Sequence, residues 1–320
     1  MYIINDINSD IKSIYGFCVM RTKSTILFTV DLPHPYNKIG DGPEGPEVRT
    51  VCDKIRPILL NRVITNAYKG ERGQSIGFEN LVFPSTITAV HSYGKKILIY
   101  TSSDQVIVVS LGMTGRLQYY PGDHSHIYFD INEYENKGPF RVVRPICKLY
   151  FDDYRYMGSV NIIPINYLQS HLSGIGPDLL AAALDEKKWI SSETWLAIFT
   201  QKKIQKWAIC KALLDQSLVS GIGNYLLSEI LYYAGILPER KINTITLEEW
   251  ETLRVVAHKI ILLSYSHGGF TIKDFISPDG AKGMYPAAVY GKKIDPYGNP
   301  VVSAKTSNGR TSHWVPAVQH

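Results

Sequence analysis

The spacing of apolar residues changes near the middle of the chain, and this change constrains the fold more than any other feature. Before about residue 163, short runs that alternate polar and apolar residues are separated by turn residues, which is typical of antiparallel strands. After residues 174–177, a break that contains glycine and proline, apolar residues recur at helical spacing. The pattern predicts a β-rich domain followed by a helical domain.

The expected elements follow this division. Strands are expected at Thr86–Ser92, Lys96–Thr101, Val106–Leu111, Leu117–Tyr120, Ile127–Ile131, Cys147–Phe151 and Ser159–Ile163. Helices are expected to start near Pro46 and to span Ile204–Asp215, Asn224–Ala234 and Leu247–Ser266. Strand-like pieces return at Ala288–Tyr290, Pro300–Ser303 and Ser312–Val315. We therefore expect an α+β chain with an extension (1–42), an antiparallel β-sandwich or barrel with flanking helices (43–170), a helical domain (171–284) and a β-hairpin unit (285–320).

Composition indicates an ordinary globular protein. The 320 residues are 45% hydrophobic and 20% charged, which suits two compact domains. The chain has neither a run of about 18 apolar residues, as a membrane span needs, nor a secretory signal pattern. The four cysteines are scattered, so we expect no disulfide framework and no cysteine zinc site. An intracellular protein that is not secreted is the expectation.

Positive charge is concentrated toward the C-terminus. Of the 34 basic and 29 acidic residues, 14 basic and 9 acidic ones lie in residues 201–320, and those of residues 1–200 cancel. This excess favours a polyanionic partner. Charge alone leaves a solvated basic surface as an equal alternative.

Four short segments carry candidate chemistry, and each also has an ordinary explanation. Pro43–Val48, PEGPEV, reads alone as a helix start, with a proline in the first turn and Glu47 at the positive end of the dipole. Leu214–Tyr225 is a helix end, a glycine turn and a new helix start; such a turn can bind a phosphate or simply join two helices. Lys95 lies at a strand end, where a solvated lysine is common. Met113 lies in a turn, where methionine often fills a core gap.

The order of these motifs along the chain is more specific than any one of them. The segments are PEGPEV (43–48), GKKILIY (94–100), LGMTGRL (111–117), DDYRYMG (152–158), LDQSLVSGIGNYLLSEILYYAGILP (214–238), GGFTIKDFISPDG (268–280) and VYGKK (289–293). Together they resemble the formamidopyrimidine-DNA glycosylase / endonuclease VIII family, from Pro43 to about Trp314. The resemblance implies an N-terminal β-sandwich, a helix-two-turn-helix domain and a C-terminal finger. It also implies a DNA glycosylase with abasic-site lyase activity.

The resemblance assigns roles to individual residues. It implies that Pro43 is the nucleophile, that Glu44 is the general acid/base and that Lys95 contacts the phosphate near the lesion. The implied DNA contacts are Met113, Arg155 and Met157, which fill the space left by an everted nucleotide, Gly223 and Asn224 at the glycine turn, and Arg310 at the fingertip. DNA with oxidised bases or abasic sites is the implied partner, bound mostly by the basic C-terminal half, and we expect a monomer.

These residue types suit the implied chemistry. A base must leave the duplex stack before an enzyme can reach it, and methionine and arginine can fill the vacated space. A secondary amine can attack the sugar C1′ and form an iminium, which acidifies the neighbouring proton and permits strand cleavage by β- and δ-elimination. Glu44 can move protons in these steps if its pKa is raised.

The chain departs from the family at both ends. In the family the nucleophile is the N-terminal proline, but here Gly42 acylates Pro43, and an amide nitrogen is not nucleophilic. Activity therefore requires that residues 1–42 be removed or that translation start differently; a substitute amine from Lys95 is a lesser alternative. If Pro43 stays blocked, a catalytically silent protein that binds damaged DNA is the second hypothesis. A regulator that binds undamaged DNA sequence-specifically is a third, supported only by the helical hairpin.

The tail departs from the family in its metal ligands. Residues 290–320 contain no cysteine, whereas many members hold zinc there with four cysteines. The tail therefore resembles the zincless finger of endonuclease VIII-like enzymes, which favours oxidised pyrimidines and ring-opened or further-oxidised purines. We expect no metal and no cofactor; His124 and His126 point to one side of a strand, but no third ligand lies near them in the sequence.

Overall fold

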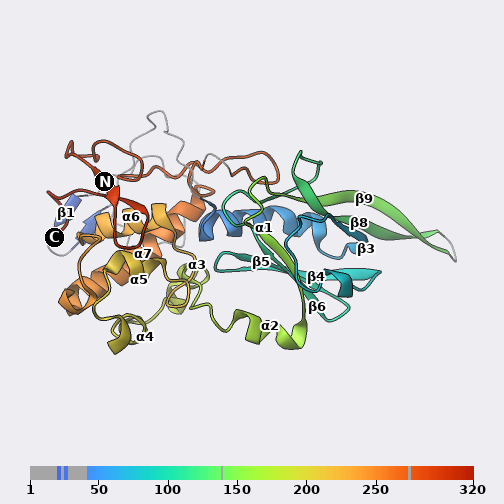
Figure 1. Ribbon diagram of the computed structural model, residues 1–320, viewed down its shortest axis with the longest axis horizontal. Coiled ribbons are helices and arrows are strands. Elements are labelled where there is room, and N and C mark those ends of the chain that lie inside the picture. The colour runs from blue at the N-terminus through green and yellow to red at the C-terminus, as the bar shows by residue number, and fades with distance from the viewer. Residues whose placement is uncertain (1–19, 23–24, 28–41, 138–139, 273–274) are drawn as a thin grey trace.

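The computed structural model describes residues 20–22, 25–27, 42–137, 140–272 and 275–320. A sheet domain, a helical domain and a tail follow one another along the chain, and the helical domain lies at one end of the long axis (Figure 1). Within the expected extension 1–42, the described part comprises Gly42 and two short paired strands, β1 (Met20–Thr22) and β2 (Thr25–Leu27). The expectation that the extension is removed or disordered otherwise lies outside the described residues.

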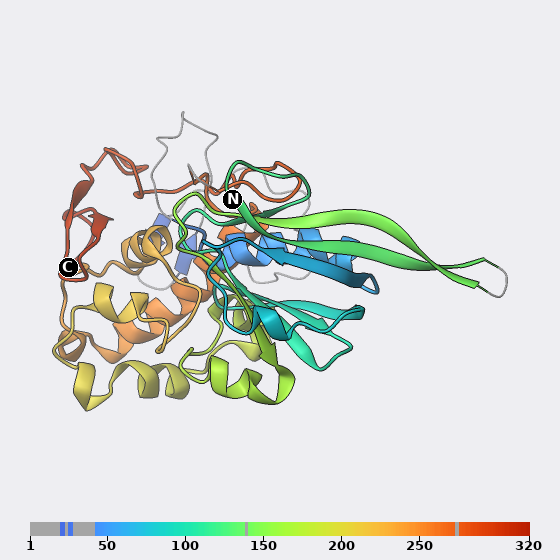
Figure 2. The ribbon, with the colours of Figure 1, turned by 45° about the vertical axis from the view of Figure 1, so that its right-hand side comes forward.

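One antiparallel sheet of eight strands forms the first domain, in the order β10-β6-β5-β4-β3-β8-β9-β7. The strands are β3 (Val63–Lys69), β4 (Ser85–Tyr93), β5 (Lys96–Thr101), β6 (Gln105–Ser110), β7 (Arg116–Gln118), β8 (Ser125–Lys137), β9 (Phe140–Asp152) and β10 (Ser159–Pro164). Only two residue pairs join β3 to β4, Val63 with Thr86 and Ile64 with Ser85. The sheet can therefore turn at this seam, and its two halves diverge in Figure 2.

Both halves bury their inner faces in the same core, as a sandwich does. Ile97 and Ile107 of one half and Phe129 and Phe151 of the other belong to one cluster of buried apolar residues. The prediction of an antiparallel β-sandwich is thereby confirmed.

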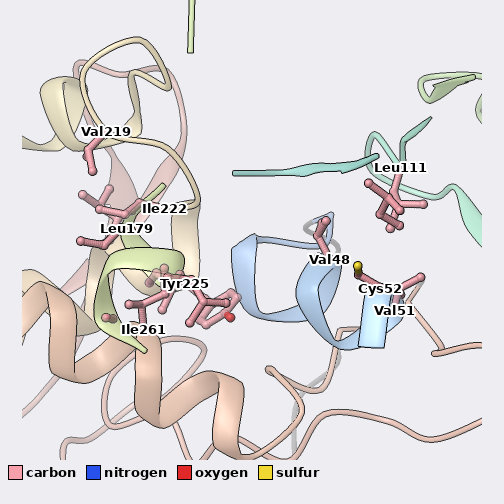
Figure 3. Packing of buried hydrophobic residues seen from close by; sticks show 14 of the residues in the cluster. Val48, Val51, Cys52, Leu111, Leu179, Val219, Ile222, Tyr225 and Ile261 are labelled. Carbon is pink, nitrogen blue, oxygen red and sulfur yellow. The ribbon is translucent and has the colours of Figure 1, made fainter. Parts of the chain in front are cut away.

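Helix α1 (Gly45–Leu59) carries this core from the sheet to the helical domain. Its buried residues recur every three or four positions, which is the spacing of one helix face: Val48, Val51, Cys52, Ile55 and Leu59. The same cluster continues to Leu179, Ile222 and Ile261 of the second domain (Figure 3). Because α1 is packed on both sides, the residues at its N-terminus lie at the junction of the two domains.

Two long helices form the centre of the helical domain. They are α6 (Asn224–Ala234) and α7 (Leu247–Ser266), and both have the bounds expected from periodicity. The shorter helices are α2 (Ile165–Leu172), α3 (Leu179–Ala183), α4 (Ser192–Phe199) and α5 (Ile209–Leu214), with 3-10 turns at Phe78–Asn80, Glu186–Lys188, Lys202–Ile204 and Ile242–Thr244. The expected helix Ile204–Asp215 is shorter than predicted, because Ala208 instead pairs with Lys241 in an isolated β-bridge.

The tail forms a small hairpin of β11 (Val302–Lys305) and β12 (Thr311–Trp314). An apolar cluster that includes Val289 and Val315 packs it against Tyr232 of α6. The buried carboxylate of Asp295 fixes the preceding turn, where it accepts hydrogen bonds from the amides of Tyr297 and Asn299 at 2.9 and 2.8 Å. Apolar packing and the Asp295 carboxylate thus help to hold a region that contains no cysteine.

Two expectations on strands need correction. Strands β8 and β9 have 13 residues each, where about five were expected, and together they extend beyond the sheet as a two-stranded ribbon (Figure 2). Residues 288–290 are not a strand, because their three amides donate to the Glu229 carboxylate at 2.7–3.0 Å instead of to a neighbouring strand. In the part of the chain that the structure describes, every helix is too short or too polar to cross a bilayer.

Candidate active site

Glu44 lies immediately before α1, and its carboxylate is bound by the start of α6. The amides of Gly223 and Tyr225 donate to this carboxylate at 2.7 and 2.9 Å. The start of a helix carries unsatisfied amides and a positive dipole end, so it binds an anion well. The side chain of Glu44 is 1% exposed. Two segments about 180 residues apart in the sequence therefore build one site.

The position of Glu44 depends on the absence of a side chain at residue 223. A Cβ there would lie 2.3 Å from the Glu44 Cδ, a distance that atoms do not tolerate. Because the Gly223 amide already donates to Glu44, the group held by this turn is a carboxyl group of the protein. The Gly223 amide is therefore occupied by Glu44 in this structure, and contact of this turn with a DNA phosphate stays a prediction.

Burial raises the pKa of Glu44 to about 8, and the nearby Glu47 carboxylate also raises it. The Lys95 ammonium lowers this pKa, as do the hydrogen bonds from Tyr225 and Gly223. Loss of hydration disfavours the charged form of an acid more than its partners favour it here. A carboxyl group of this kind holds its proton near neutral pH and can donate it, which is the property of a general acid.

Glu47 fixes the backbone of Glu44 from the next turn of the chain. Its carboxylate accepts hydrogen bonds from the Glu44 amide at 2.8 Å and from the Tyr225 hydroxyl at 2.9 Å. It also accepts one from the Phe270 amide at 2.6 Å, while Tyr225 shares a further bond with Ser264. Glu47 is fully buried, and burial raises its pKa. This network places α1, α6 and α7 around one carboxyl group.

Pro43 is buried beside this site. Gly42, which acylates it, passes over the turn at residues 112–113: a Cβ on Gly42 would lie 2.6 Å from both the Gly112 carbonyl oxygen and the Met113 Cα. The residue before the proline therefore occupies space directly against the turn that the sequence assigns to DNA contact. In this form of the chain the Pro43 nitrogen is an amide and carries no free lone pair.

Lys95 lies in the turn between β4 and β5 and is half-buried. Its charge is the second-largest influence on the pKa of Glu44, so the two side chains share one electrostatic environment. The sequence-predicted pair of Glu44 and Lys95 is thus brought together, although about 50 residues separate them in the chain.

Two loops bring together the other residues expected at the lesion. The Arg155 guanidinium lies 3.7 Å from the Met113 sulfur, and Met157 is 49% exposed on the same loop as Arg155. The buried Asp153 joins the loops, because it accepts hydrogen bonds from Thr114 of the first and from the Gly158 amide of the second, the latter at 2.7 Å. Exposed side chains on a rigid base suit contact with DNA.

Asn224 and the tip of the tail hairpin form a further group. The Asn224 side-chain amide donates to the Thr311 carbonyl oxygen at 2.9 Å, and Arg310 is the preceding, exposed residue. The hairpin turn is closed by hydrogen bonds between Thr306 and Arg310, with the Thr306 amide donating at 3.0 Å. The glycine turn and the fingertip arginine are therefore on adjacent backbone, although they are distant in the sequence.

Sequence reasoning missed three buried acids that support the site: Asp153, Asp178 and Glu229. Glu229 could have been found, because it is the one charged residue within Asn224–Ala234, and a lone acid in an apolar helix has to be satisfied when buried. Asp178 follows a proline and precedes apolar residues, which is a helix-cap signal. Asp153 gave no such signal, because its partners lie in two loops.

The described residues give no support for a metal site. No group of three His, Cys, Asp or Glu side chains that could hold an ion gathers among them. His126 instead packs its ring edge-on against Phe151, with 5.4 Å between ring centroids, and shares a hydrogen bond of 2.8 Å with the His124 carbonyl oxygen. The histidine pair therefore has an ordinary packing role.

Comparison with known proteins identifies the class of this architecture. Residues 42–160 match the formamidopyrimidine-DNA glycosylase N-terminal domain, 175–275 match its H2TH domain and 284–320 match its C-terminal domain. The three matches cover the sheet domain, the helical domain and the tail in the order described above.

Individual relatives indicate the same family as the three domain matches. The formamidopyrimidine-DNA glycosylase of Xanthomonas axonopodis pv. citri is 30% identical over 264 residues, which is 78% of this chain and 89% of that protein. That of Thermomicrobium roseum is 28% identical over 297 residues, or 87% of this chain and 99% of that protein. The crystal structure of the MutM (Fpg) protein of Thermus thermophilus superposes with a TM-score of 0.73 at 26% identity and covers 87% of this chain and 98% of that one. This chain belongs to the formamidopyrimidine-DNA glycosylase family. The matches do not separate an endonuclease VIII-like subtype.

Proposed function

We propose that this chain excises oxidised bases from DNA and then cleaves the strand at the abasic site. The observation that carries the proposal is the buried carboxyl of Glu44, with its pKa raised to about 8, next to Pro43 and in the field of Lys95. A nucleophile, a proton donor and a cation for a phosphate are the parts that the reaction needs. Relatives that bear the name formamidopyrimidine-DNA glycosylase support the substrate class.

The reaction begins with the free secondary amine of Pro43, after the bond to Gly42 has been broken. The nitrogen attacks the sugar C1′, the bond from C1′ to the damaged base breaks, and the base leaves with the bonding electrons. Glu44 gives its proton to the ring oxygen O4′ as the C1′–O4′ bond opens, and the proton of the nitrogen passes to the departed base, which leaves an iminium. Glu44 is protonated at neutral pH because of its burial, so it is ready for this step.

Strand cleavage follows from the iminium. The positive nitrogen withdraws electrons and acidifies the C2′ proton, which the ionised Glu44 can accept. The C3′–O bond then breaks and the 3′ phosphate leaves with its electron pair; a second elimination releases the 5′ phosphate. Water hydrolyses the remaining iminium to an aldehyde, releases a proton and restores the amine. Lys95 is proposed to hold the phosphate next to the lesion during these steps, as a positive charge with three donors.

DNA is proposed to lie across the loops and the fingertip. Met113, Arg155 and Met157 would enter the stack when the nucleotide is everted, because they are exposed or half-exposed and held by Asp153 from below. Asn224 and Arg310 would contact the backbone. We propose a substrate range of ring-opened purines and oxidised pyrimidines; the cysteine-free tail supports the pyrimidines, and the names of the relatives support the purines.

The second candidate is a damage-binding protein without catalysis. The acylated Pro43 favours it, because a chain that keeps Gly42 has no amine at this position. In that case the loops and the fingertip would still recognise a lesion, while no covalent step could begin.

Borohydride trapping tests the proposal. Two forms are compared on duplex DNA with an abasic site: one whose first residue is Pro43, and one that keeps Gly42. Borohydride reduces an iminium and makes the bond to C1′ permanent, so the first form should give a covalent protein–DNA band and the second none. Equal trapping by both forms would contradict Pro43 as the nucleophile, and trapping by neither would favour the binding protein.

A further inference from the structure

One strip of the helical domain, formed by residues 176–178 and 220–223, contacts two parts of the sheet domain. Residues 176–178 lie beside Ser220, whose amide donates to the Pro177 carbonyl at 2.8 Å. From Ser220 the chain continues into the glycine turn, where the Gly221 carbonyl accepts a hydrogen bond from the Gly45 amide at 2.9 Å. The start of α1, and Glu44 with it, is therefore fixed on this strip.

The turn that carries Lys95 is fixed on the same strip. The Gly94 amide donates to the Asp178 carboxylate at 2.9 Å, and the Tyr93 hydroxyl donates to the Gly176 carbonyl at 3.2 Å. Gly94 has a positive φ of 56°, and a Cβ there would lie 2.8 Å from the Ser220 hydroxyl oxygen. A glycine is therefore required for this close approach.

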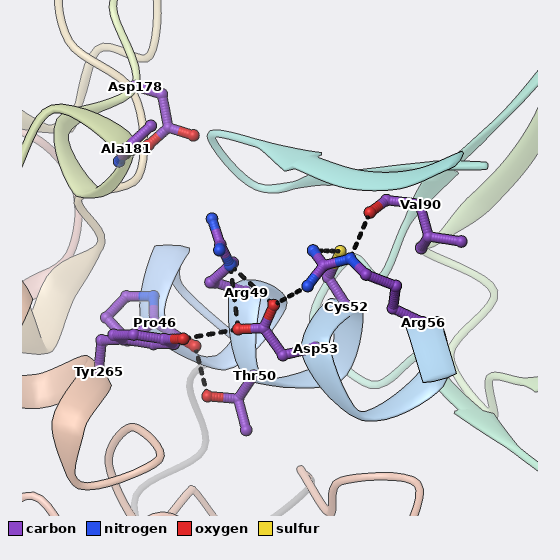
Figure 4. Close-up of polar contacts among 10 residues, drawn as sticks. All are labelled: Pro46, Arg49, Thr50, Cys52, Asp53, Arg56, Val90, Asp178, Ala181 and Tyr265. Carbon is purple, nitrogen blue, oxygen red and sulfur yellow. Dashed lines mark hydrogen bonds and ion pairs between the residues drawn. The ribbon is translucent and has the colours of Figure 1, made fainter. Parts of the chain in front are cut away.

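Asp178 serves two domains with its two carboxylate oxygens. One accepts from the Gly94 amide, and the other accepts from the Ala181 amide at 3.0 Å and caps α3. The side chain is 8% exposed. Arg49 of α1, which pairs with Asp53 at 3.0 Å, points toward Asp178 (Figure 4). Burial raises the pKa of Asp178, whereas the bonds from Ala181 and Gly94 and the Arg49 charge lower it.

We propose that Asp178 is a positioning residue that sets Lys95 at Glu44 through its bond to the Gly94 amide. This inference rests on the proposed function, because it assumes that Lys95 takes part in the reaction. A carboxylate that capped α3 alone would need one oxygen; the second bond crosses the domain junction to the residue before Lys95. Docking of the helical domain thus places the acid and the cation together, because both are held by the strip formed by residues 176–178 and 220–223.

The substitution Asp178→Ser separates the two bonds. Serine is a good helix cap, so α3 keeps its acceptor for the Ala181 amide, but the shorter side chain no longer reaches Gly94. Asp185→Ser is the matched control, because Asp185 caps the turn Glu186–Lys188 through the Lys187 amide, within the helical domain. Lys95→Ala gives the effect of losing the cation itself.

Two measurements need no catalysis. The first is hydrogen exchange at the Gly94 amide, which should become at least about tenfold faster in Asp178→Ser, since the bond that protects it is lost. The second is the titration of the Glu44 carboxyl carbon by NMR. The groups that face Glu44 are Lys95, Glu47 and Tyr225. Because the Lys95 charge lowers the Glu44 pKa, Lys95→Ala should raise this pKa. Asp178→Ser should also raise it, because Lys95 is then displaced.

A third measurement is single-turnover excision by the form that starts at Pro43. Misplacement of a catalytic group by about 1 Å can cost about 100-fold in rate, so we expect Asp178→Ser to lose about 10- to 100-fold and Asp185→Ser to stay near the parent. An unchanged Glu44 titration in Asp178→Ser, with or without faster exchange, would overturn the inference and leave Asp178 as a helix cap. Failure of the proposed function would appear elsewhere, as an absence of trapping by the parent.

Discussion

Glu44 and Glu229 are two buried carboxyl groups associated with helix α6. Glu44 is the proposed catalytic acid, whereas Glu229 has a structural role. Glu44 reaches the start of α6 from another domain and accepts from the amides of Gly223 and Tyr225. Glu229 lies within α6 and accepts from three successive amides of the tail, residues 288–290. Burial raises the pKa of both. A raised pKa and a set of amide donors therefore do not distinguish a catalytic acid from a structural one.

Glu44 and Glu229 differ in the groups that surround them besides the amide donors. Glu44 has Lys95 among the main influences on its pKa and Pro43 as the preceding residue, so it is close to a cation and to the proposed nucleophile. The influences on Glu229 are burial and its hydrogen-bond donors, with the Tyr285 hydroxyl as the fourth. One carboxylate joins two domains around a proposed reaction; the other joins a helix to the tail. The following experiments test that division.

Glu44→Gln should have the largest effect on catalysis. A general acid contributes about 10²–10⁴-fold in rate, so base excision by the form that starts at Pro43 should fall by that factor while DNA affinity changes little. Excision by the parent should also decline as pH rises through about 8, because the carboxyl then loses the proton that it donates. Single-turnover rates across the neutral and alkaline range check both points. A variant that keeps the alkaline decline would show that another group titrates.

Glu229→Gln should instead lower stability. One acceptor oxygen is replaced by a donor that faces backbone amides, and a buried unsatisfied group costs about 1–3 kcal/mol. Urea unfolding should show a loss of about 2–3 kcal/mol, with excision well below the unfolding temperature close to the parent value. If Glu229→Gln loses excision as deeply as Glu44→Gln and is as stable as the parent, the division between the two acids is wrong.

Arg155→Ala should have a smaller, DNA-dependent effect. The guanidinium touches Met113, so both are expected to enter the same space in the duplex, and the double variant with Met113→Ala should lose less than the sum of the two singles, as neighbours do. We expect about tenfold slower excision from duplex DNA with fold and stability unchanged. Tyr154→Ala, on the same exposed loop, is the control; an equal loss there would remove the special role of Arg155.

Arg310→Ala should have the smallest effect. Loss of one phosphate contact lowers the slope of log affinity against log salt by about 1 and weakens binding to all sequences alike. Fluorescence anisotropy at several salt concentrations measures the slope. Lys305→Ala removes a charge from the same hairpin, and an identical change in both variants would indicate a general effect of charge and no fingertip contact.

The spacing of apolar residues predicted the helices and strands that bury one face in the core. The bounds of α6, α7 and β5 agree with those expected from periodicity. Strand β3 was missed, because its sequence VITNAYK mixes polar residues into a strand whose partners are distant. The ribbon of β8 and β9 was underestimated, because residues 132–137 are mostly polar and the adjacent Val142 and Val143 are both exposed, so the pattern does not alternate there.

The candidate site could also be predicted from the sequence only in part. PEGPEV alone predicted only a helix start, and the role of Glu44 came from the resemblance. Its partners, the amides of Gly223 and Tyr225, could not be predicted from residue types, because any residue except proline offers an amide. The contact of Asp178 with Gly94 was inaccessible for the same reason, although the cap itself was readable.

The ribbon formed by β8 and β9 has a practical consequence. It extends away from the helical domain and the tail (Figure 2), and Val143 on it is 46% exposed. Because the proposed nucleophile is a free amine at Pro43, which a fusion or label at that end would block, reporter groups have to be attached elsewhere. A cysteine in place of Val143 would accept a fluorophore there and let energy transfer follow the arrival of labelled DNA without crowding the reacting atoms.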